Sequence, residues 1–318
     1  MKIVIPGGSG QVGQMLARHF HGQGHEVVIL SRSVASAAWR VVVWDGVSRG
    51  QWVQEMEGSD VCINLTGRSV NCRYTAENRR QIYDSRVVST RLMGEVIAGL
   101  ERPPAVWLNS STATIYRHAL DRAMDEPTGE LGGGEVGAPD TWRFSIEVAK
   151  GWEESFFSVA TPRTRKVALR SAMTFSPDRG GVFDVFLGLV RCGLGGTQGA
   201  GSQYISWIHE VDFIRAVELL IADESFTGAV NLAAPSPLPN RDFMLVLRQA
   251  WGIGFGLPAA AWMIELGTWA MRTESELVLK SRRVVPGRLL EAGFDFRYPE
   301  WPLAAKELVG RWRAMRES

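Results

Sequence analysis

Apolar and polar positions alternate in blocks along the first half of the chain. Short apolar, β-branched runs predict strands at residues 1–6, 25–30, 41–44, 60–65, 105–109 and 166–169. Longer stretches with apolar residues at helical spacing predict helices at residues 14–22, 76–100, 142–159 and 211–221. Strands that alternate with helices in this way indicate an α/β fold built on a doubly wound parallel sheet.

A glycine-rich stretch joins the first predicted strand to the first predicted helix. It reads Gly7-Gly8-Ser9-Gly10-Gln11-Val12-Gly13. At a strand-to-helix turn, glycines permit the tight bend, let backbone N–H groups approach a pyrophosphate and let the helix pack on the strand. The helix N-terminus adds partial positive charge for the same anion. The stretch therefore predicts a dinucleotide site of the Rossmann type, and a structural turn without a ligand is the alternative.

The end of the second predicted strand indicates which dinucleotide fits. A protein that prefers NAD places Asp or Glu there for the ribose 2′-hydroxyl, whereas this chain has Ser31-Arg32-Ser33. A guanidinium pairs well with a 2′-phosphate, and the serine hydroxyls add hydrogen bonds. We therefore expect NADP(H) as the cofactor, with NAD less favoured; a solvated Arg32 is the alternative.

Polar residues also follow two later predicted strands. They are Asn64-Leu65-Thr66-Gly67 and Ser110-Ser111-Thr112. In doubly wound sheets the ligand lies across the carboxyl ends of the strands. We therefore expect Asn64, Leu65, Thr66, Gly67 and Ser110 at the cofactor.

The second half of the chain predicts a smaller lobe. A glycine-rich segment at 193–201 and a proline-rich one at 234–239 indicate loops or crossings between lobes, and the glycines offer a second place for a phosphate. We expect a Rossmann domain from 1–170 plus about 205–233, and a substrate lobe from about 171–204 plus 234–318. Tryptophans recur in this lobe, and either core packing or an exposed protein interface explains them; they are Trp251, Trp262, Trp269, Trp301 and Trp312.

Composition narrows the class of partner. The chain has 318 residues and a net charge of +1, so it has no overall attraction to nucleic acid or an anionic membrane. Three dispersed cysteines suit neither a disulfide framework nor a metal site and favour a reducing compartment. We expect a cytoplasmic protein, monomeric or homodimeric, with a small-molecule substrate and no metal.

Several motifs spread over nearly the whole chain fit one known pattern. Besides residues 7–13 and 64–67, they are Ser85-Arg86-Val87, Ser110-Ser111-Thr112-Ala113-Thr114-Ile115-Tyr116 and Ser206-Trp207-Ile208-His209-Glu210-Val211-Asp212. These motifs resemble the extended short-chain dehydrogenase/reductases. The second half, with residues 193–203, 231–235 and 285–296, resembles the atypical epimerase-like branch that has a small C-terminal module. Proteins of that branch are usually labelled nucleoside-diphosphate-sugar epimerases.

The resemblance implies roles for particular side chains. In the wider superfamily a Tyr exchanges a proton with the substrate hydroxyl, a Lys holds the ribose and a Ser or Thr orients the hydroxyl. By motif position Thr112 takes the hydroxyl role and Lys150 that of the Lys, for catalysis and for cofactor binding. The position expected to hold the Tyr is Ile146, which cannot transfer a proton.

Three explanations of Ile146 remain open. Another group transfers the proton, with Tyr116 the first candidate and His209 the second, although His209 also fits a structural role at the start of a helix. Alternatively, the substrate carbonyl is activated in another way, or the protein binds NADPH without turnover. Arg86 is equally consistent with a surface charge and with a group that reaches the site. The predicted function is an NADP(H)-binding oxidoreductase-like protein acting on an unknown carbonyl or alcohol, then a non-catalytic NADPH-binding regulator, then a nucleoside-diphosphate-sugar epimerase.

Overall fold

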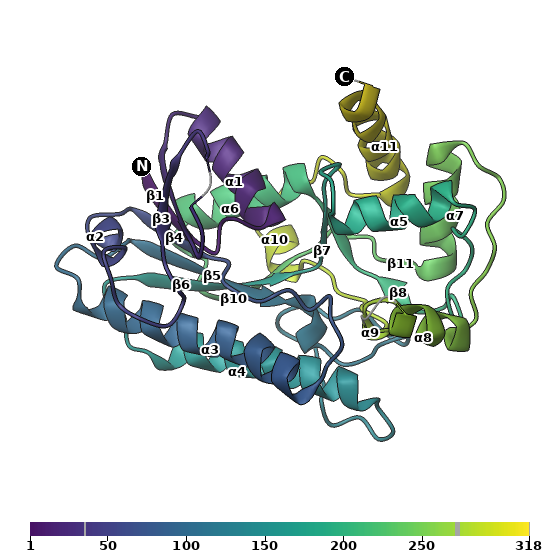
Figure 1. Cartoon of the computed structure of the whole chain (residues 1–318), viewed down its shortest axis with the longest axis horizontal. Coiled ribbons are helices and arrows are strands. Elements are labelled where there is room, and N and C mark those ends of the chain that lie inside the picture. Colours follow the sequence, from purple (N-terminus) through teal and green to yellow (C-terminus); the bar gives the residue numbers. More distant parts are fainter. Residues whose placement is uncertain (35, 271–273, 318) are drawn as a thin grey trace.

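A seven-stranded, all-parallel sheet forms the centre of the molecule (Figure 1). The computed structural model describes residues 1–34, 36–270 and 274–317. The strand order is β10-β6-β5-β4-β1-β2-β3, which confirms the doubly wound α/β fold. The strands are β1 (Lys2–Pro6), β2 (Glu26–Ser31), β3 (Arg40–Val43), β4 (Val61–Asn64), β5 (Val106–Thr112), β6 (Arg165–Ser171) and β10 (Gly228–Leu232).

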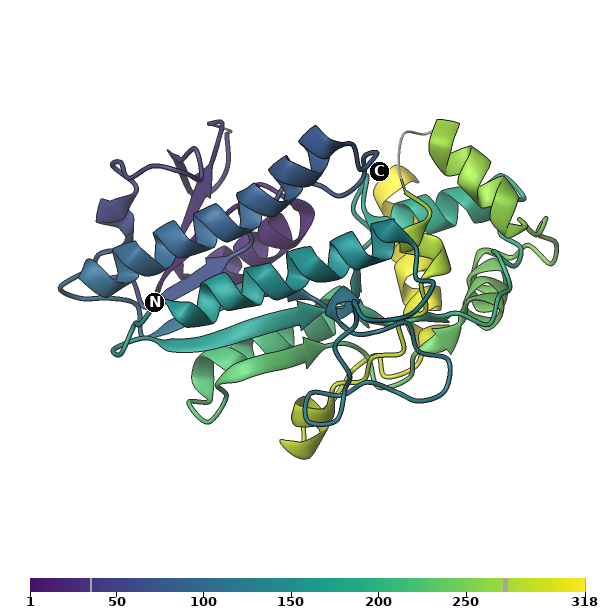
Figure 2. The same ribbon diagram turned by 90° about the horizontal axis from the view of Figure 1, so that it is seen from below.

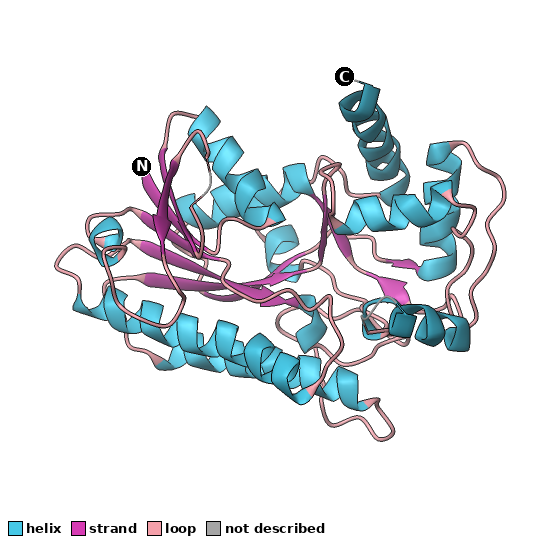
Figure 3. Ribbon diagram, in the orientation of Figure 1, coloured by secondary structure: helices cyan, strands magenta, loops and turns pink. Residues whose placement is uncertain are grey.

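Helices cover both faces of this sheet (Figure 3). One face carries α1 (Gln11–Gly22), α6 (Glu210–Ala222) and α10 (Gly287–Glu291). The other carries α3 (Ala76–Gly99), α4 (Asp140–Ser158) and the short α2 (Val53–Met56), which packs in the same core as α3. Successive residues of a strand point to opposite faces. Ile3 and Ile5 accordingly pack with α1 and α6, whereas Val4 between them packs with α3 and α4. Burial on both faces explains why these strands are continuously apolar.

A second lobe lies beside the sheet, toward the right of Figure 2. Its core contains Phe175, Trp207, Phe243 and Trp301. Its elements are β7 (Met173–Phe175), α5 (Val182–Arg191), β8 (Tyr204–Ile205), β9 (Trp207–His209), β11 (Leu238–Pro239), α7 (Asn240–Trp251), α8 (Ala261–Ala270), α9 (Glu276–Leu279) and α11 (Trp301–Glu317), and a 3-10 turn, η1 (Ala113–Ile115), follows β5. The chain returns from this lobe to the sheet at β10, which pairs with β6, and at α10.

The tryptophans of the second half divide into two groups. Trp301 and Trp312 are buried in the second core, as core packing requires. Trp262 and Trp269 on α8 are each 66% exposed, so packing does not account for them. Within residues 1–34, 36–270 and 274–317, no helix has both the length and the apolar character to cross a bilayer.

Candidate functional site

Two adjoining cavities open where the strand order reverses. β1 lies between β2 and β4, so the loops after these strands diverge at the carboxyl edge of the sheet. The first cavity, of about 840 Å³, is lined by residues between Gly7 and Ser85. The second, of about 480 Å³, is lined by residues between Gly7 and Arg282. Both are lined by Gly7, Gly10 and Leu65, so they form one groove across β1.

Two glycines of the loop pack closely against neighbouring backbone, whereas the third, Gly10, faces open space. Gly7 has φ +73°, and a Cβ there would lie 2.7 Å from the Cα of Thr66. A Cβ on Gly13 would lie 2.4 Å from the Cα of Gly8. At Gly10 the nearest atom would be 4.0 Å away, and Gly10 caps α1 without a side-chain hydrogen bond. The first turn of α1 therefore offers backbone N–H groups to the groove.

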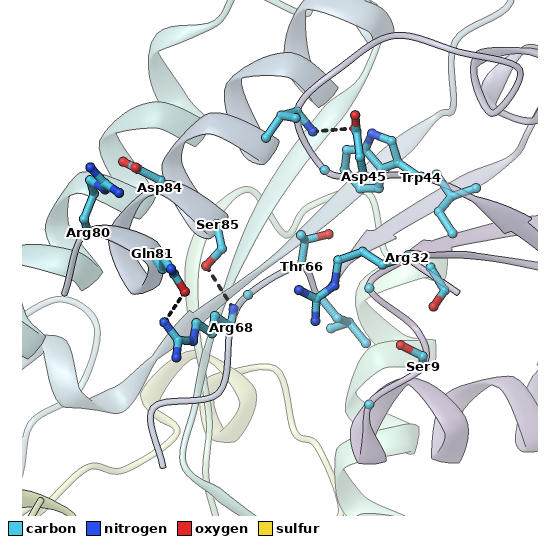
Figure 4. A pocket seen from close by; sticks show the side chains of 18 residues that line it. Ser9, Arg32, Trp44, Asp45, Thr66, Arg68, Arg80, Gln81, Asp84 and Ser85 are labelled. Atoms are coloured by element: carbon cyan, nitrogen blue, oxygen red, sulfur yellow. Dashed lines mark hydrogen bonds between the residues drawn. The ribbon is translucent and has the colours of Figure 1, made fainter. Parts of the chain in front are cut away.

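Arg32 projects into the first cavity from the end of β2, toward the loop that contains Thr66 (Figure 4). Ser31 also lines this cavity, and its hydroxyl accepts a hydrogen bond from the backbone N–H of Ser33 at 3.4 Å. Thr66 has a buried hydroxyl oxygen with no hydrogen-bond partner among the described residues. Since buried polar groups normally find partners, this hydroxyl is suited to a ligand.

Charged groups surround the rest of the first cavity. Arg68 and Arg80 line it together with Arg32, against the two carboxylates of Asp45 and Asp84. Arg68 donates to the side chain of Gln81, which holds its guanidinium on the α3 side (Figure 4). An excess of cations beside free helical N–H groups is suited to phosphate.

Asp45 lies at the opposite wall, after β3. Its carboxylate accepts hydrogen bonds from the backbone N–H groups of Val47 and Ser48, both at 2.8 Å, and from the Ser48 hydroxyl. These bonds, led by the hydroxyl, hold the pKa of Asp45 below its ordinary value. Asp45 therefore remains a negatively charged acceptor at the rim, a role that the sequence did not reveal.

Most residues expected at the cofactor line the two cavities. Those at the first cavity are Gly7, Ser9, Gly10, Ser31, Arg32, Leu65, Thr66 and Gly67. Those at the second, besides the shared three, are Gln11, Val12, Gly13 and Ser110. Thr112, expected in the catalytic hydroxyl role, also lines the second cavity.

Three expected cofactor residues, Gly8, Asn64 and Lys150, line neither cavity. Gly8 packs against β1 and β2, where an added Cβ would lie 2.9 Å from a side-chain carbon of Ile29. Asn64 is fully buried, donates to the side-chain oxygen of Asn109 at 2.7 Å and accepts from the backbone N–H of Thr66 at 3.1 Å. Asn64 thus positions the Thr66 loop and does not face the groove.

Tyr116 lies away from both cavities, contrary to the expectation that it faces the nicotinamide site. It is 2% exposed, and its hydroxyl donates to Asn231 at 3.0 Å and accepts from Arg170 at 2.9 Å. Arg170 also forms a buried ion pair with Glu153, with an N–O distance of 2.7 Å. Burial raises the pKa of Tyr116. The hydroxyl is therefore held inside a structural network beside α4.

Lys150 also lies outside both cavities. Its side chain is exposed and approaches Gly133, and Ile146 is buried against the adjacent Gly132. The face of α4 that lines the second cavity instead carries Phe144, Ser145, Val148 and Trp152. At about 100° per residue, this face lies almost opposite the face that carries Ile146 and Lys150. Lys150 does not line the groove, so its expected contact with the cofactor stays a prediction.

His209 has a structural place. Its Nδ1 accepts a hydrogen bond from the backbone N–H of Val211 at 3.1 Å, which caps α6, and its Nε2 is 2.8 Å from the Glu307 carboxylate. The ring is fully buried and stacks on Tyr298. His209 lines neither cavity, so only its predicted capping role agrees with the geometry.

The glycine-rich segment at 193–201 supports the chain crossing. The N–H groups of Gly196 and Gly199 donate to the carbonyls of Leu257 and Ala259, at 3.1 and 2.8 Å. These groups are therefore used within the protein, and the segment lines neither cavity.

The second cavity contains ionisable groups that the sequence analysis missed or left open. Tyr74, Glu276 and Arg282 were missed, and Arg86 was left open. Arg86 donates to the carbonyls of Ile82 and Arg68 at 2.9 and 3.0 Å, and burial lowers its pKa to about 10. Burial and the nearby Glu276 carboxylate raise the pKa of Tyr74 to about 12.

Ser145 lies among these groups. Its hydroxyl donates to the Glu276 carboxylate and lies 3.5 Å from the Tyr74 hydroxyl oxygen. The only sequence signal for Ser145 is its place beside Phe144, Val148 and Trp152, whose spacing of four marks one face of the helix.

Comparison with known proteins gives a family for the first part of the chain and a domain for the last. Residues 3–134 match the NAD dependent epimerase/dehydratase family, and residues 259–308 match a domain of unknown function, DUF1731. The epimerase family protein SSP1921 of Staphylococcus saprophyticus is 29% identical over 307 residues, which cover 96% of this chain and 98% of the relative. The human epimerase family protein SDR39U1 is 26% identical, over 97% of this chain and 100% of the relative.

The similarity extends to a solved structure. The crystal structure of human SDR39U1 (isoform 2) with NADPH superposes with a TM-score of 0.84 at 25% identity, over 98% of this chain and 99% of that one. Residues 3–134 of this chain are therefore similar to the NAD dependent epimerase/dehydratase family, and residues 259–308 are similar to DUF1731.

Proposed function

We propose that the chain binds NADPH along the groove and acts as an NADP(H)-dependent oxidoreductase on a small carbonyl compound or alcohol. The observation that carries the proposal is the joint position of the glycine loop and Arg32 in one cavity, at the carboxyl ends of β1 and β2. This is where a doubly wound sheet holds a dinucleotide, with the second strand selecting the 2′-substituent.

The residues at the groove fit such a cofactor. The open side of Gly10 and the first turn of α1 would receive the pyrophosphate, and Arg32 with Ser31 the 2′-phosphate. The unpartnered Thr66 hydroxyl offers one more hydrogen bond, and Ser110 and Thr112 would lie at the nicotinamide end. When bound, the dinucleotide supplies or accepts a hydride at its nicotinamide ring. The human relative crystallised with NADPH supports the choice of cofactor.

Specific contacts favour a second candidate, a non-catalytic NADPH-binding regulator. Ile146 replaces the usual proton-transferring Tyr, Tyr116 is locked to Asn231 and Arg170, and Lys150 lies outside both cavities. The two candidates bind the same cofactor and differ only in turnover. Oxidation of NADPH by a small carbonyl compound separates them.

Titration of the protein with NADPH and with NADH tests the cofactor site. We expect tighter binding of NADPH, and we expect Arg32→Ala to weaken NADPH binding by about 10- to 100-fold, since a charge-assisted hydrogen bond contributes about 1.5–3 kcal/mol. NADH binding should stay within about twofold of wild type. Arg102→Ala is the matched control, because Arg102 is exposed and lies outside both cavities. Equal affinity for the two cofactors would contradict the 2′-phosphate assignment, and absence of binding would contradict the function.

A further inference from the structure

The DUF1731 segment closes the second cavity. Glu276, Leu277 and Arg282, all from this segment, line the cavity beside α4. Glu274 accepts a hydrogen bond from the backbone N–H of Tyr74 at 2.7 Å, which ties the segment to the loop before α3. The second cavity is therefore complete only when the C-terminal domain packs on the sheet domain.

Three side chains in the second cavity link the C-terminal segment to the sheet domain through their polar atoms. The Ser145 hydroxyl, on α4, donates to the Glu276 carboxylate, and the Tyr74 hydroxyl lies 3.5 Å from the same serine oxygen. Glu276 is 1% exposed, whereas Ser145 is partly exposed to the cavity. Ser145 can thus touch a molecule in the cavity, and Glu276 can reach that molecule through the serine.

We propose, on the basis of the proposed function, that Ser145 is the catalytic residue that exchanges a proton with the substrate oxygen, and that Glu276 takes up and returns this proton. The assignment gives the DUF1731 segment a chemical role. It also removes the need for a tyrosine at position 146, because the proton path starts at Ser145, on the face of α4 that lines the second cavity.

The proton transfers balance in both directions. In oxidation the alcohol gives its hydroxyl proton to the Ser145 oxygen while the Ser145 proton moves to the Glu276 carboxylate, and the carbon loses its hydride to the cofactor. In reduction the carbonyl carbon gains a hydride, and its oxygen takes the Ser145 proton as the neutral Glu276 acid restores it. The serine is regenerated each time, and Glu276 gives its extra proton to water after an oxidation or takes one from water after a reduction, so one proton and one hydride are exchanged per turnover.

The groups that face Glu276 set the direction of its titration. Arg282 is 3.3 Å away on the same segment, and Ser145 donates from α4. From the same segment, Lys280 adds a positive charge and Glu274 adds a negative one. Tyr74 faces Glu276 from the loop before α3. Burial outweighs the neighbouring cations and raises the pKa of Glu276. The carboxyl group can therefore hold a proton at a pH where exposed glutamates are charged.

An infrared titration tests this arrangement without a substrate. The difference spectrum between wild type and Glu276→Gln should contain the absorbance of a protonated carboxylic acid at pH values well above the ordinary glutamate pKa of about 4.3. Ser145→Ala should move the loss of this band to higher pH, because the charged form loses its hydrogen bond. Glu147→Gln, at an exposed position on α4, is the control and should leave the band in place. A missing band, or a titration that ignores Ser145→Ala, would overturn the assignment.

Turnover of two carbonyl probes, 2,3-butanedione and 4-nitrobenzaldehyde, tests the chemistry. Ser145→Ala should lower kcat for NADPH oxidation about 100-fold while NADPH binding stays within about twofold. Wild-type kcat should fall as the pH rises through the Glu276 pKa, and Glu276→Gln should abolish this limb of the profile. If Glu276→Gln does not fold, Ser145→Ala still decides the question.

The outcomes separate the two claims. If the wild type turns over a probe and Ser145→Ala leaves this turnover unchanged, the proposed proton path is overturned, but the proposed oxidoreductase function stands. Absence of wild-type turnover with both probes overturns the oxidoreductase and, with it, the proton path.

Discussion

The two cavities of the groove differ in how the chain builds them. Among the described residues, those that line the first cavity all lie within 7–85, at the ends of β1 to β4, in the loops that follow these strands and in the first half of α3. The second cavity combines the glycine loop, α4 and the C-terminal Glu276 and Arg282. The first cavity, which we call the first end of the groove, is thus built by motifs that are local in the sequence. The second cavity, which we call the second or reactive end, is built by residues that are far apart in the chain and meet only in the folded protein. The first end is expected to be common to many proteins of this fold, and the second to be particular to this chain.

The largest effect should come from the buried ion pair behind the second cavity. Ser110 and Thr112 of β5 line this cavity, while Ser111 between them donates to Glu153 at 2.6 Å, and Glu153 pairs with Arg170. Breaking a buried pair leaves one charge uncompensated, so Glu153→Gln should lower the free energy of unfolding by about 3–5 kcal/mol in denaturant titrations.

The exposed pair of Glu77 and Arg80 provides the control. Both side chains are more than half exposed, so Glu77→Gln should leave the free energy of unfolding almost unchanged. Equal losses in the two variants would mean that the long-range packing behind the second cavity is not a major source of stability.

Two substitutions in the glycine loop should have different effects, one on the stability of the protein and the other on NADPH binding. Gly13→Ala places a Cβ 2.4 Å from the Cα of Gly8 and should cost about 1–3 kcal/mol of stability. Gly10→Ala has no atom within 4.0 Å to displace, so it should keep the melting temperature and weaken NADPH binding by filling the open side. Thermal unfolding and NADPH titration of both variants measure this. A Gly10→Ala protein that binds NADPH normally would show that the phosphates do not approach there.

Lys280 links the C-terminal domain to the end of β5. It is 1% exposed, its ammonium donates to the Thr114 carbonyl at 2.7 Å, and burial lowers its pKa to about 7. Above pH 7 the unfolded chain binds this proton and the folded chain does not, so stability should rise with pH by up to about 1.4 kcal/mol per unit, until the unfolded pKa of about 10.4 is reached.

Lys280→Met should reduce this slope between pH 7 and 9, measured by urea titration at each pH. The variant keeps a long apolar side chain but has no titrating group. A wild-type slope that survives the substitution would mean that another group controls the pH dependence.

Tyr116→Phe should have a modest effect on the fold. The ring stays and two hydrogen bonds, to Asn231 and from Arg170, are lost, so we expect about 1–2 kcal/mol less stability. Turnover of the carbonyl probes should stay within about twofold, because the hydroxyl lies outside the cavity. A much larger loss of kcat would indicate that Tyr116 takes part in catalysis and would weaken the assignment of Ser145 as the proton-transferring residue.

The sequence predicted the first end well because its signals are local. The strands, the glycine loop and the residues after β2 and β4 lie within short windows, where the alternation of strand and helix places them at one sheet edge. Gly8 and Asn64 show the limit of this reasoning. Each belongs to the right motif, yet a motif does not say which of its residues faces the ligand and which supports the loop.

The second end was less predictable because its residues are far apart in the chain. Ser145 and Glu276 are separated by 131 residues, and no periodic pattern connects them. The face of α4 that carries Ile146 and Lys150 was expected at the cofactor, whereas the nearly opposite face lines the second cavity, since a resemblance in motif fixed the helix but not its rotation. The apolar spacing of Phe144, Val148 and Trp152 is the better guide to the buried face, because burial is what sets the rotation of a helix.

A crystal structure of the chain with NADPH tests the central claim most directly. The account predicts that the 2′-phosphate lies within hydrogen-bond distance of the Arg32 guanidinium and that the nicotinamide ring enters the second cavity beside Ser145 and Thr112. A nicotinamide ring on the side of α4 that carries Lys150, or a 2′-phosphate with no contact to Arg32, would contradict it.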